Sequence, residues 1–317
     1  MRRAHCFELS ANRSPATRAS GRALLRSWRP LAAALPVLAA GLVALAGAGA
    51  ALASEPASRI LSIGGAVTEI VYALEQEHRL IARDTTSTFP SEAEDLPDVG
   101  YMRALSPEGV LSVEPDLIIS AEGAGPPETI EVLDAASIPF VTVPEGYTAD
   151  AVVEKINVVG EALEVPDAAG ALASEVAAKL QAAASAAEAA ASGSDEKSVL
   201  FILSTQGGRV MASGTGTAAD GIIRLAGAQN AVSEFEGYKQ MSDEAVAALA
   251  PDVILMMDRG GNHGAADEEL FAMPALVTTP AAQDRAVVRM NGLTLLGFGP
   301  RTADAVTALS DALYGGS

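Results

Sequence analysis

The sequence contains an internal repeat, and this repeat constrains the fold more than any other feature. The stretch from Ala104 to Ile119 (ALSPEGVLSVEPDLII) can be laid over the stretch from Gln240 to Leu255 (QMSDEAVAALAPDVIL) at an offset of 136 residues. Three echoes in one order favour two similar units over a chance recurrence of Pro-Asp before a strand. Two similar lobes leave a cleft between them, where ligands commonly bind. The two shorter echoes pair Gly100-Tyr101-Met102-Arg103 with Gly237-Tyr238-Lys239, and Thr68–Leu74 with Ala219–Leu225.

Short apolar runs alternate with helical patterns along the chain. This alternation indicates βαβ units and mainly parallel sheets, so the predicted fold class is α/β with two Rossmann-like lobes. Between the lobes, residues 149–191 are rich in Ala, Glu and Lys, which predicts helix with a break near Val165-Pro166-Asp167. The predicted divisions are 54–147 for the N-terminal lobe, 148–192 for the linking helical segment and 193–317 for the C-terminal lobe. The predicted strands are Arg59–Ile63, Leu80–Ala82, Asp116–Ser120 and Pro139–Val143, then Ser198–Leu203, Arg209–Ala212, Asp252–Met257 and Ala286–Met290.

Residues 1–53 have the three parts of a secretory signal peptide. A basic stretch with one acid, Glu8, is followed by an apolar run from Leu31 to about Leu52, which ends in Ala51-Leu52-Ala53. A small-x-small ending is typical of a signal that is cleaved, here after Ala53, and we expect export to the periplasm. An uncleaved membrane anchor is the alternative, since the run approaches the roughly 20 residues of a membrane span. The basic residues are Arg2, Arg3, Arg13, Arg18, Arg22, Arg26 and Arg29.

Removal of residues 1–53 leaves a strongly acidic chain. Its 264 residues carry 14 basic and 39 acidic side chains, a net charge of −25. Nucleic acid and anionic membranes would be repelled by such a surface, which argues against both as partners. The single cysteine, Cys6, lies in the signal, so the mature chain forms no disulfide. A chain of this size needs none in the periplasm, and we expect a monomer.

Three segments resemble a known family, the haem-specific periplasmic substrate-binding proteins of ABC importers. They are Ser62–Ile70 (SIGGAVTEI), Asp98–Ser106 (DVGYMRALS) and Pro115-Asp116-Leu117. The Thr-Glu and Pro-Asp elements are shared with the wider group that binds siderophores and cobalamin, whereas Gly-Tyr-Met-Arg-x-Leu-Ser is more specific for haem. The resemblance covers nearly the whole mature chain. It implies two lobes bridged by one rigid helix, with little hinge closure when the ligand binds.

Tyr101 is the predicted axial ligand of the haem iron. A tyrosine phenolate is a hard anionic donor suited to ferric iron. Because an ordinary tyrosine has a pKa of about 10, its ionisation at neutral pH needs help from the metal or from a nearby cation. Arg103 is the predicted helper, since residues i and i+2 of an extended segment point the same way. The resemblance assigns the same two roles, and a solvated loop pair is the alternative.

Tyr238 and Lys239 occupy the matching place in the second lobe and are predicted to support the haem site. The resemblance implies a basic residue from this loop, usually arginine, that reaches the ligating tyrosine or a haem propionate. Lysine keeps the charge but lacks the planar fork of arginine, which puts a bidentate contact in doubt. Some relatives place a histidine before a Gly-Gly pair where this chain has Gln206, so no second ligand is expected there.

Three arginines and one histidine are further candidates for the cleft. Arg209, Arg259 and Arg83 are candidates to pair with propionates, because carboxylates that enter a cleft need charged donors. Each is alternatively a solvated residue at a strand end. His263, in the Gly-rich segment 260–264, is a candidate for a weak second ligand, although a lone loop histidine is more often solvated.

Glu108 and Glu244 match each other across the repeat, and each lies two residues after a predicted N-cap serine, Ser106 or Ser242. An acid in the first turn stabilises a helix through its dipole. In the wider family the corresponding acids dock the two lobes onto arginines of the permease dimer. Both roles are compatible, and the resemblance therefore predicts that these carboxylates contact an ABC transporter permease.

The predicted function is periplasmic binding of haem and its delivery to an ABC permease, with haem as the transported ligand. A ferric siderophore or corrinoid carrier of the same architecture is the alternative, and a secreted α/β enzyme is a third reading. No Ser/His/Asp set, HExxH motif or P-loop is present in the sequence, and only two histidines remain after residue 53. We therefore expect no enzymatic activity and no metal site other than the iron that Tyr101 ligates.

Overall fold

A computed structural model describes residues 56–258 and 266–315. The chain divides into two units, Met1–Ala53 and Ser54–Ser317, and the architecture below is that of the second. The predicted signal peptide lies outside the described residues. Among the described residues, none of the helices is both long enough and apolar enough to cross a membrane.

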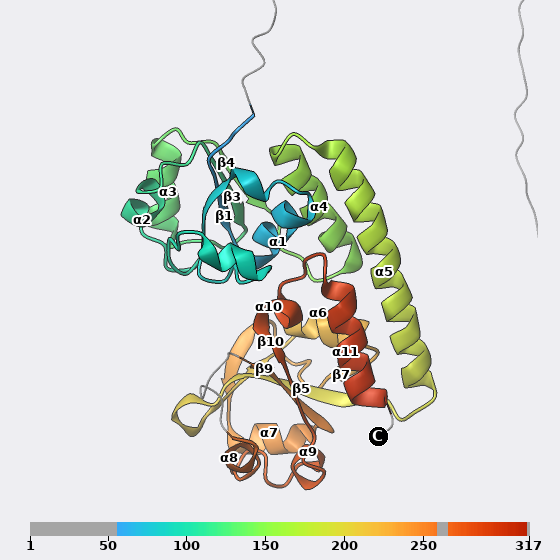
Figure 1. The fold of residues 1–317 in the computed structure, drawn as a ribbon. Coiled ribbons are helices and arrows are strands. Elements are labelled where there is room, and N and C mark those ends of the chain that lie inside the picture. Colours follow the sequence, from blue (N-terminus) through green and yellow to red (C-terminus); the bar gives the residue numbers. More distant parts are fainter. Residues whose placement is uncertain (1–55, 259–265, 316–317) are drawn as a thin grey trace, which may run out of the picture. The chain divides into compact units, whose positions relative to one another are not determined.

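The N-terminal lobe is built on a four-stranded sheet in the order β2-β1-β3-β4. All its strand pairs are parallel, as the sequence predicts. Helices cover both faces of this sheet, with α2 and α3 on one side and α1 and α4 on the other (Figure 1). The strands are β1 (Ile60–Ile63), β2 (Leu80–Arg83), β3 (Leu117–Ala121) and β4 (Phe140–Val143), and the helices are α1 (Gly65–Ala73), α2 (Pro107–Leu111) and α3 (Pro127–Ala135), with 3-10 turns at Glu77–Arg79 and Ser91–Asp95.

The C-terminal lobe has a mixed sheet in the order β10-β9-β5-β6-β8, with β7 pairing β5. The pairs of β5 with β9 and of β9 with β10 are parallel, whereas β6 is antiparallel to both β5 and β8. The strands are β5 (Ser198–Ser204), β6 (Val210–Ser213), β7 (Gln229–Asn230), β8 (Tyr238–Met241), β9 (Val253–Asp258) and β10 (Val287–Asn291). The helices are α6 (Ala218–Leu225), α7 (Asp243–Leu249), α8 (Asp267–Phe271), α9 (Pro280–Gln283), α10 (Gly292–Leu296) and α11 (Thr302–Tyr314), with a 3-10 turn at Gln206–Gly208.

Two helices link the lobes, α4 (Ala149–Ala162) and α5 (Pro166–Ser192). The break between them lies where it was predicted: Glu164 has a positive φ of 60° and Pro166 opens α5. Proline is tolerated in the first turn of a helix because it lacks only an N–H that has no helical partner there. With 27 residues, α5 is about 40 Å long and runs beside both lobes (Figure 1).

The internal repeat is confirmed in the backbone. Ser106 and Ser242 both cap their helices, accepting hydrogen bonds from the N–H groups of Gly109 and Ala245. One residue before each Pro-Asp pair, Glu114 and Ala250 adopt the left-handed conformation, with φ of 49° and 46°. Each Pro-Asp aspartate then anchors the start of a central strand: the Asp116 carboxylate accepts from the N–H groups of Ser58 and Arg59, and that of Asp252 accepts from Ser198 N–H.

The sheet of the C-terminal lobe packs a different core on each face. Alternate residues of β5 separate accordingly: Val199 and Phe201 belong to a cluster that continues into the N-terminal lobe, and Leu200 and Ile202 belong to a second cluster with α7, α8 and α9. Because side chains alternate across a strand, membership of these clusters identifies the face on which each residue lies. We call the first the inner face and the second the outer face.

Candidate functional site

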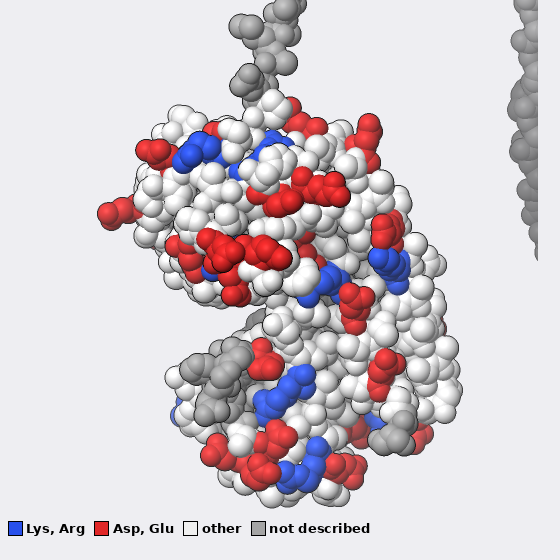
Figure 2. All heavy atoms as spheres, in the orientation of Figure 1, with Lys and Arg blue, Asp and Glu red and all other residues white. Residues whose placement is uncertain are grey.

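Specific side-chain contacts join the two lobes at the inner face. The Glu69 carboxylate of α1 accepts hydrogen bonds from the backbone N–H and from Nη2 of Arg301, at 3.1 and 2.9 Å. The guanidinium carbon of Arg301 lies 3.4 Å from the centre of the Phe89 ring. A Cβ at Gly65 would collide with the side chain of Leu293, so this glycine allows the lobes to approach closely. Figure 2 shows the surface hollowed into a recess between the lobes.

Tyr101 lies in the turn that precedes α2. Its carbonyl accepts a hydrogen bond from Ala104 N–H at 2.7 Å, and Gly100, with φ +105°, precedes it. The residue is 47% exposed, and within the described residues its hydroxyl has no protein hydrogen bond. The phenol oxygen is therefore accessible to a ligand.

Asp98 and Arg83 hold this turn in place. One carboxylate oxygen of Asp98 accepts from Gly100 N–H at 2.8 Å and from the Thr85 hydroxyl at 3.0 Å. The other accepts from Nη1 of Arg83 at 3.2 Å, while Arg83 also donates to the carbonyls of Ala93 and Asp84. The guanidinium of Arg83 is thus engaged inside its own lobe. Pairing of Arg83 with a ligand carboxylate stays a prediction, and in the structure this side chain supports the turn that carries Tyr101.

Arg103 lies in the same turn, so the extended geometry assumed from the sequence is wrong. Residues 101–104 curl back on themselves, and Arg103 is exposed without a hydrogen bond or ion pair inside the described structure. Its positive charge acts on two other phenols, lowering the pKa of both Tyr147 and Tyr238 against the stronger opposing effect of burial. Assistance to Tyr101 by Arg103 remains a prediction.

Tyr238 lies on the inner face of the second sheet, in β8. Its ring packs edge-on against Phe201, with centroids 6.5 Å apart. Burial raises the pKa of the Tyr238 phenol, and the nearby hydroxyls of Ser213 and Thr217 and the charge of Arg103 oppose this rise. The residue is still 39% exposed.

Lys239 lies on the opposite face of the sheet from Tyr238. The segment that was expected to be a loop is strand β8, in which neighbouring residues point to opposite faces. The ammonium of Lys239 lies 4.9 Å from the centre of the Phe235 ring, and Phe235 packs on the outer cluster. The structure therefore does not bring Lys239 to the tyrosines.

Of the other predicted support residues, only Arg209 is described. It precedes β6 and donates to the side-chain oxygen of Gln240 at 3.5 Å. Arg209 lies four positions before Ser213, the residue of β6 that pairs with Tyr238 of β8. At the rise of a strand, this offset is roughly 13 Å. Arg259 and His263 lie outside the described residues.

Tyr147 is close enough to Arg103 and Tyr238 for their charges to affect its pKa. The sequence did not predict it as a site residue. Its ring contacts Phe298 edge-on at 5.4 Å between centroids. A Cβ at Gly221 would lie 2.6 Å from its carbonyl oxygen, so only glycine lets α6 pack this closely against it. A sequence signal existed: the chain has three Gly-Tyr dipeptides, and they place Tyr101, Tyr147 and Tyr238.

Two charged residues, Glu145 and the buried Lys155, lie close to Tyr147. Burial, followed by the charge of the nearby Glu145 carboxylate, raises the pKa of Tyr147 to about 12. The ammonium of Lys155, whose side chain is only 3% exposed, lies 3.8 Å from the same carboxylate. Burial lowers the pKa of Lys155, and Glu145 opposes this effect. The charge of Glu145 is therefore balanced within the lobe.

Glu108 and Glu244 lie in the first turns of α2 and α7, each two residues after its capping serine. Both are exposed, and in the part of the chain that is described neither carboxylate has an ion pair or a side-chain hydrogen bond. Stabilisation of each helix alone does not explain why Glu108 and Glu244 occupy matching positions in the two lobes. The carboxylates are available to an external partner.

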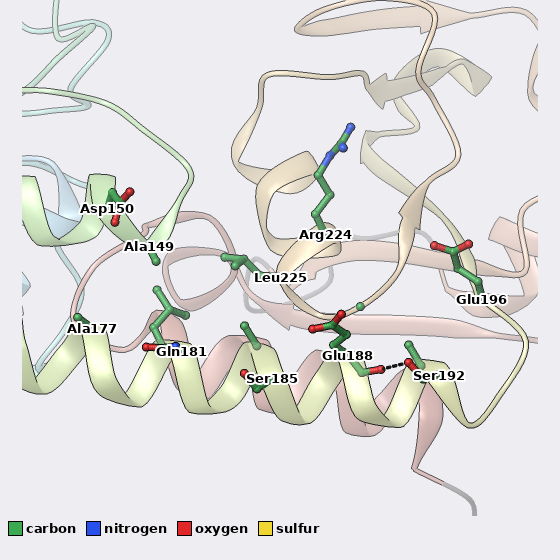
Figure 3. Close-up of a pocket in the computed structure, with 14 residues that line it drawn as sticks. Ala149, Asp150, Ala177, Gln181, Ser185, Glu188, Ser192, Glu196, Arg224 and Leu225 are labelled. Carbon is green, nitrogen blue, oxygen red and sulfur yellow. Dashed lines mark hydrogen bonds between the residues drawn. The ribbon is translucent and has the colours of Figure 1, made fainter.

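A separate groove lies along α5. It has a volume of about 910 Å³ and is lined by the start of α4, one face of α5 and the end of α6. Figure 3 shows Gln181, Glu188 and Ser192 along α5, with Arg224 opposite. No tyrosine lines this groove, so it does not form part of the candidate site. Across residues 56–258 and 266–315 there is also no cluster of three His, Cys, Asp or Glu side chains that could hold a metal ion.

Comparison with known proteins identifies the family. The chain is similar to the periplasmic haem-binding protein BhuT in complex with two haems, with 42% identity, a TM-score of 0.77, and coverage of 81% of this chain and 98% of that one. It is similar to the periplasmic haem-binding protein RhuT from Roseiflexus sp. RS-1 in apo form, with 35% identity, a TM-score of 0.75 and coverage of 81% and 98%. A vitamin B12-binding protein of Vibrio campbellii is 30% identical over 42% of this chain and 48% of its own length.

The family model described as "Periplasmic binding protein" matches residues 60–292. This match includes the Tyr101 turn, both linking helices and the sheets of both lobes. Proteins of this kind are substrate-binding components of ABC transporters rather than enzymes, which confirms the expectation that the chain is not an enzyme. From its sequence match and its fold, the chain belongs to the periplasmic binding protein family.

Proposed function

We propose that this protein binds haem in the periplasm and delivers it to an ABC transporter permease. The observation that carries the proposal is Tyr101, an exposed phenol without a hydrogen bond in the described structure, carried by a turn that Asp98 anchors. Two similar solved structures are named as periplasmic haem-binding proteins, and both are at least 35% identical over about four fifths of this chain.

Tyr101 supplies the oxygen donor for ferric iron in this proposal. Tyrosine is an established haem ligand, and a metal ion favours the phenolate over the phenol. The turn restricts where the donor oxygen can lie, because Asp98 fixes Gly100 and Ala104 N–H closes the turn behind it. A ligand atom held on a pre-ordered backbone loses less conformational entropy when iron binds.

A corrinoid carrier is the second candidate. The observation in its favour is the 30% identity to a vitamin B12-binding protein, although the matched segment covers under half of either chain. The motif around Tyr101 and the higher identity to haem-binding structures over most of the chain favour haem.

Delivery requires export and docking. We propose that residues 1–53 direct the chain to the periplasm, where the mature protein acts as a monomer. Glu108 and Glu244 are placed at equivalent points of the two lobes and are exposed, so a two-fold symmetric permease can engage both with the same kind of basic residue. Charge pairs at the rim of an interface mainly steer and orient association.

A visible-absorbance titration tests the proposal. Purified residues 54–317 are titrated with haemin, and in parallel with cyanocobalamin and with a ferric siderophore. The proposal predicts a stoichiometric Soret shift and a high-spin tyrosinate charge-transfer band with haemin only. Saturable binding of cyanocobalamin or the siderophore, without a response to haemin, would replace it with the alternative.

A further inference from the structure

The start of α1 is capped by another segment of the chain. The residue at its N-cap position, Gly64, has no side chain that could accept a hydrogen bond from the first turn. The acceptors come instead from residues 84–87, which follow β2. The Asp84 carboxylate accepts from Gly64 N–H at 2.8 Å, and the hydroxyl of Thr86 accepts from Gly65 N–H at 3.2 Å. Segment 84–87 is therefore fastened to α1.

Asp84 is fully buried, and hydrogen bonds satisfy both of its carboxylate oxygens. The oxygen that accepts from Gly64 N–H also accepts from the Ser87 hydroxyl at 2.7 Å. The other oxygen accepts from the N–H and the hydroxyl of Thr86, at 2.9 and 2.8 Å. Burial of a carboxylate is costly unless its oxygens are hydrogen-bonded, so the structure favours the one arrangement in which these donors keep their places.

Two further hydroxyls extend this network into β1 and α1. The Ser87 hydroxyl lies 2.7 Å from that of Thr68 on α1, which lies 2.7 Å from that of Ser62 on β1. All three side chains are buried. The network around Asp84 therefore joins β1, α1 and segment 84–87.

The same segment pairs with residues 97–100, which lead directly into Tyr101. This pairing is parallel and extends the edge of the sheet beyond β2. Thr85 N–H donates to Gly100 O at 3.0 Å, and the Thr85 hydroxyl donates to the Asp98 carboxylate, also at 3.0 Å. The backbone before Tyr101 thus depends on Thr85, whose neighbours on both sides belong to or adjoin the buried network.

We infer that Asp84 is a positioning residue for Tyr101. Its buried carboxylate fixes segment 84–87 on α1, and the hydrogen bonds of Thr85 then fix the turn that carries the phenol. The phenol oxygen is therefore held near its iron-binding position before the ligand arrives, which reduces the entropy lost on binding. This inference rests on the proposed function, in which Tyr101 ligates the iron of haem.

Two substitutions remove successive parts of this support. Asp84→Asn replaces one acceptor oxygen by an NH2 group, so donors to that oxygen lose their acceptor. Thr85→Val keeps the buried carboxylate but removes the hydroxyl that donates to Asp98, and Thr85→Ser restores that hydroxyl.

Asp116→Asn is the matched control. Asp116 also accepts from backbone N–H groups, those of Ser58 and Arg59. It precedes β3, whereas Asp84 follows β2, and these strands run in the same direction, so the two aspartates lie at opposite ends of one sheet. Circular dichroism and thermal midpoints verify that each variant is folded.

Hydrogen exchange of the ligand-free mature protein, followed by NMR, reports on the turn directly. We expect the amides of Val99 and Gly100 to exchange about tenfold faster in Asp84→Asn, because local opening of the turn becomes easier. Thr85→Val should also accelerate them, and Thr85→Ser and Asp116→Asn should not. Unchanged exchange in folded Asp84→Asn overturns the inference. If Asp84→Asn does not fold, wild-type exchange in Thr85→Val overturns it.

Haemin titration then relates the turn to ligand binding. Asp84→Asn should bind haemin about tenfold more weakly, because the turn must be ordered on binding. Its tyrosinate charge-transfer band should broaden, since the phenol oxygen takes up several positions around the iron. An affinity loss no larger than that of Asp116→Asn, with an unchanged band, overturns the inference and leaves the proposed function standing. Failure of the wild type to bind haemin overturns the proposed function, and with it the role of Asp84 in ligation, whatever the exchange rates show.

Discussion

The three tyrosines of the Gly-Tyr dipeptides occupy different environments. Tyr101 is exposed and has no protein hydrogen bond within the described residues, which suits a ligand for iron. Burial and the charge of Glu145 raise the pKa of Tyr147 to about 12, so its phenol stays protonated at neutral pH. Tyr238 is 39% exposed, and burial raises the pKa of its phenol. The three phenols therefore differ in burial and in the charged and polar groups near them, which are the factors that shift a pKa.

The raised pKa of Tyr147 predicts a decline in stability at alkaline pH. Between pH 10 and about 12 the unfolded chain loses the phenol proton, whereas the folded protein keeps it, because burial, Glu145 and Tyr238 outweigh Arg103. Ionisation then favours the unfolded state, so the free energy of unfolding falls through this window and is unaffected by this group below it. Urea unfolding of wild type and Tyr147→Phe measures the effect. The variant should show a shallower decline, and parallel curves for the two proteins would contradict the assignment.

The ion pair of Glu69 with Arg301 predicts a large local contribution to stability. Glu69 is 5% exposed and accepts from both the backbone and the side chain of Arg301. Glu69→Ala leaves a partly buried guanidinium without its carboxylate, which costs about 3 kcal/mol in such sites. The urea midpoint should fall accordingly. Glu175→Ala, which removes an exposed partner of Lys179 on α5, is the control and should leave the midpoint unchanged. A loss as small as that of the control would show that the pair is not a significant contact between the lobes.

At the scale of elements, the repeat and the apolar runs predicted most of the architecture. All eight predicted strands are present within one or two residues of their predicted bounds, and the helix break at Val165-Pro166 is confirmed. These signals are local: apolar periodicity, proline and helix caps act within a few residues. Strand β8 was missed because Tyr238–Met241 is an exposed edge segment with two polar residues at its centre.

The candidate site was less predictable because its contacts join distant segments. Tyr147 meets Phe298 and Gly221, more than 70 residues away, and nothing near Tyr147 in the sequence records this. The direction of Arg103 depends on a turn closed by Ala104, and the wrong assumption of an extended segment linked it to Tyr101 alone. Lys239 was predicted to lie near the haem because it matches the segment around Tyr101 in the repeat. The two segments differ in structure, since residues 101–104 form a turn and Tyr238–Met241 form strand β8.

The packing of α4 on α5 predicts opposite effects for two glycines. A Cβ at Gly160 would collide with that of Ala169, whereas at Gly170 on α5 it would meet only open space. Gly160→Ala should lower stability by about 1–3 kcal/mol through overpacking. Gly170→Ala should raise it by about 0.5–1 kcal/mol, because alanine loses less backbone entropy in a helix. Both are measured by urea unfolding, and equal effects of the two substitutions would contradict the described contact between the helices.

At the scale of the whole molecule, one hydrophobic cluster extends from the N-terminal lobe to the inner face of the second sheet. It includes Ile60 and Ile118 of the first lobe, Leu180 of α5, and Phe201 and Val306 of the second. Separation of the lobes would expose this cluster and break the pair of Glu69 with Arg301. The structure therefore favours two lobes that keep their relative position, as the rigid linking helix implies.

Such a body can present two matched docking points to a two-fold partner. We predict that Glu108→Lys combined with Glu244→Lys leaves haem binding intact but abolishes transport and transporter-stimulated ATP hydrolysis. Stability should fall by at most about 1 kcal/mol for each residue, through the helix dipole. Glu128→Lys with Asp167→Lys is the matched control, since both are exposed first-turn acids of other helices. Normal uptake by the double Glu108 and Glu244 variant would show that these acids only stabilise their helices.

The central claim is that this protein carries haem through a tyrosine ligand, and one measurement tests it most directly. Haemin is titrated into the wild-type mature protein and into Tyr101→Phe, which preserves the ring and removes the oxygen. Tyr72→Phe in α1 is the control for loss of a tyrosine elsewhere. The account predicts a tyrosinate charge-transfer band and stoichiometric binding in the wild type and control, and loss of the band with much weaker binding in Tyr101→Phe. An unchanged spectrum in Tyr101→Phe, or no saturable binding by the wild type, would contradict it.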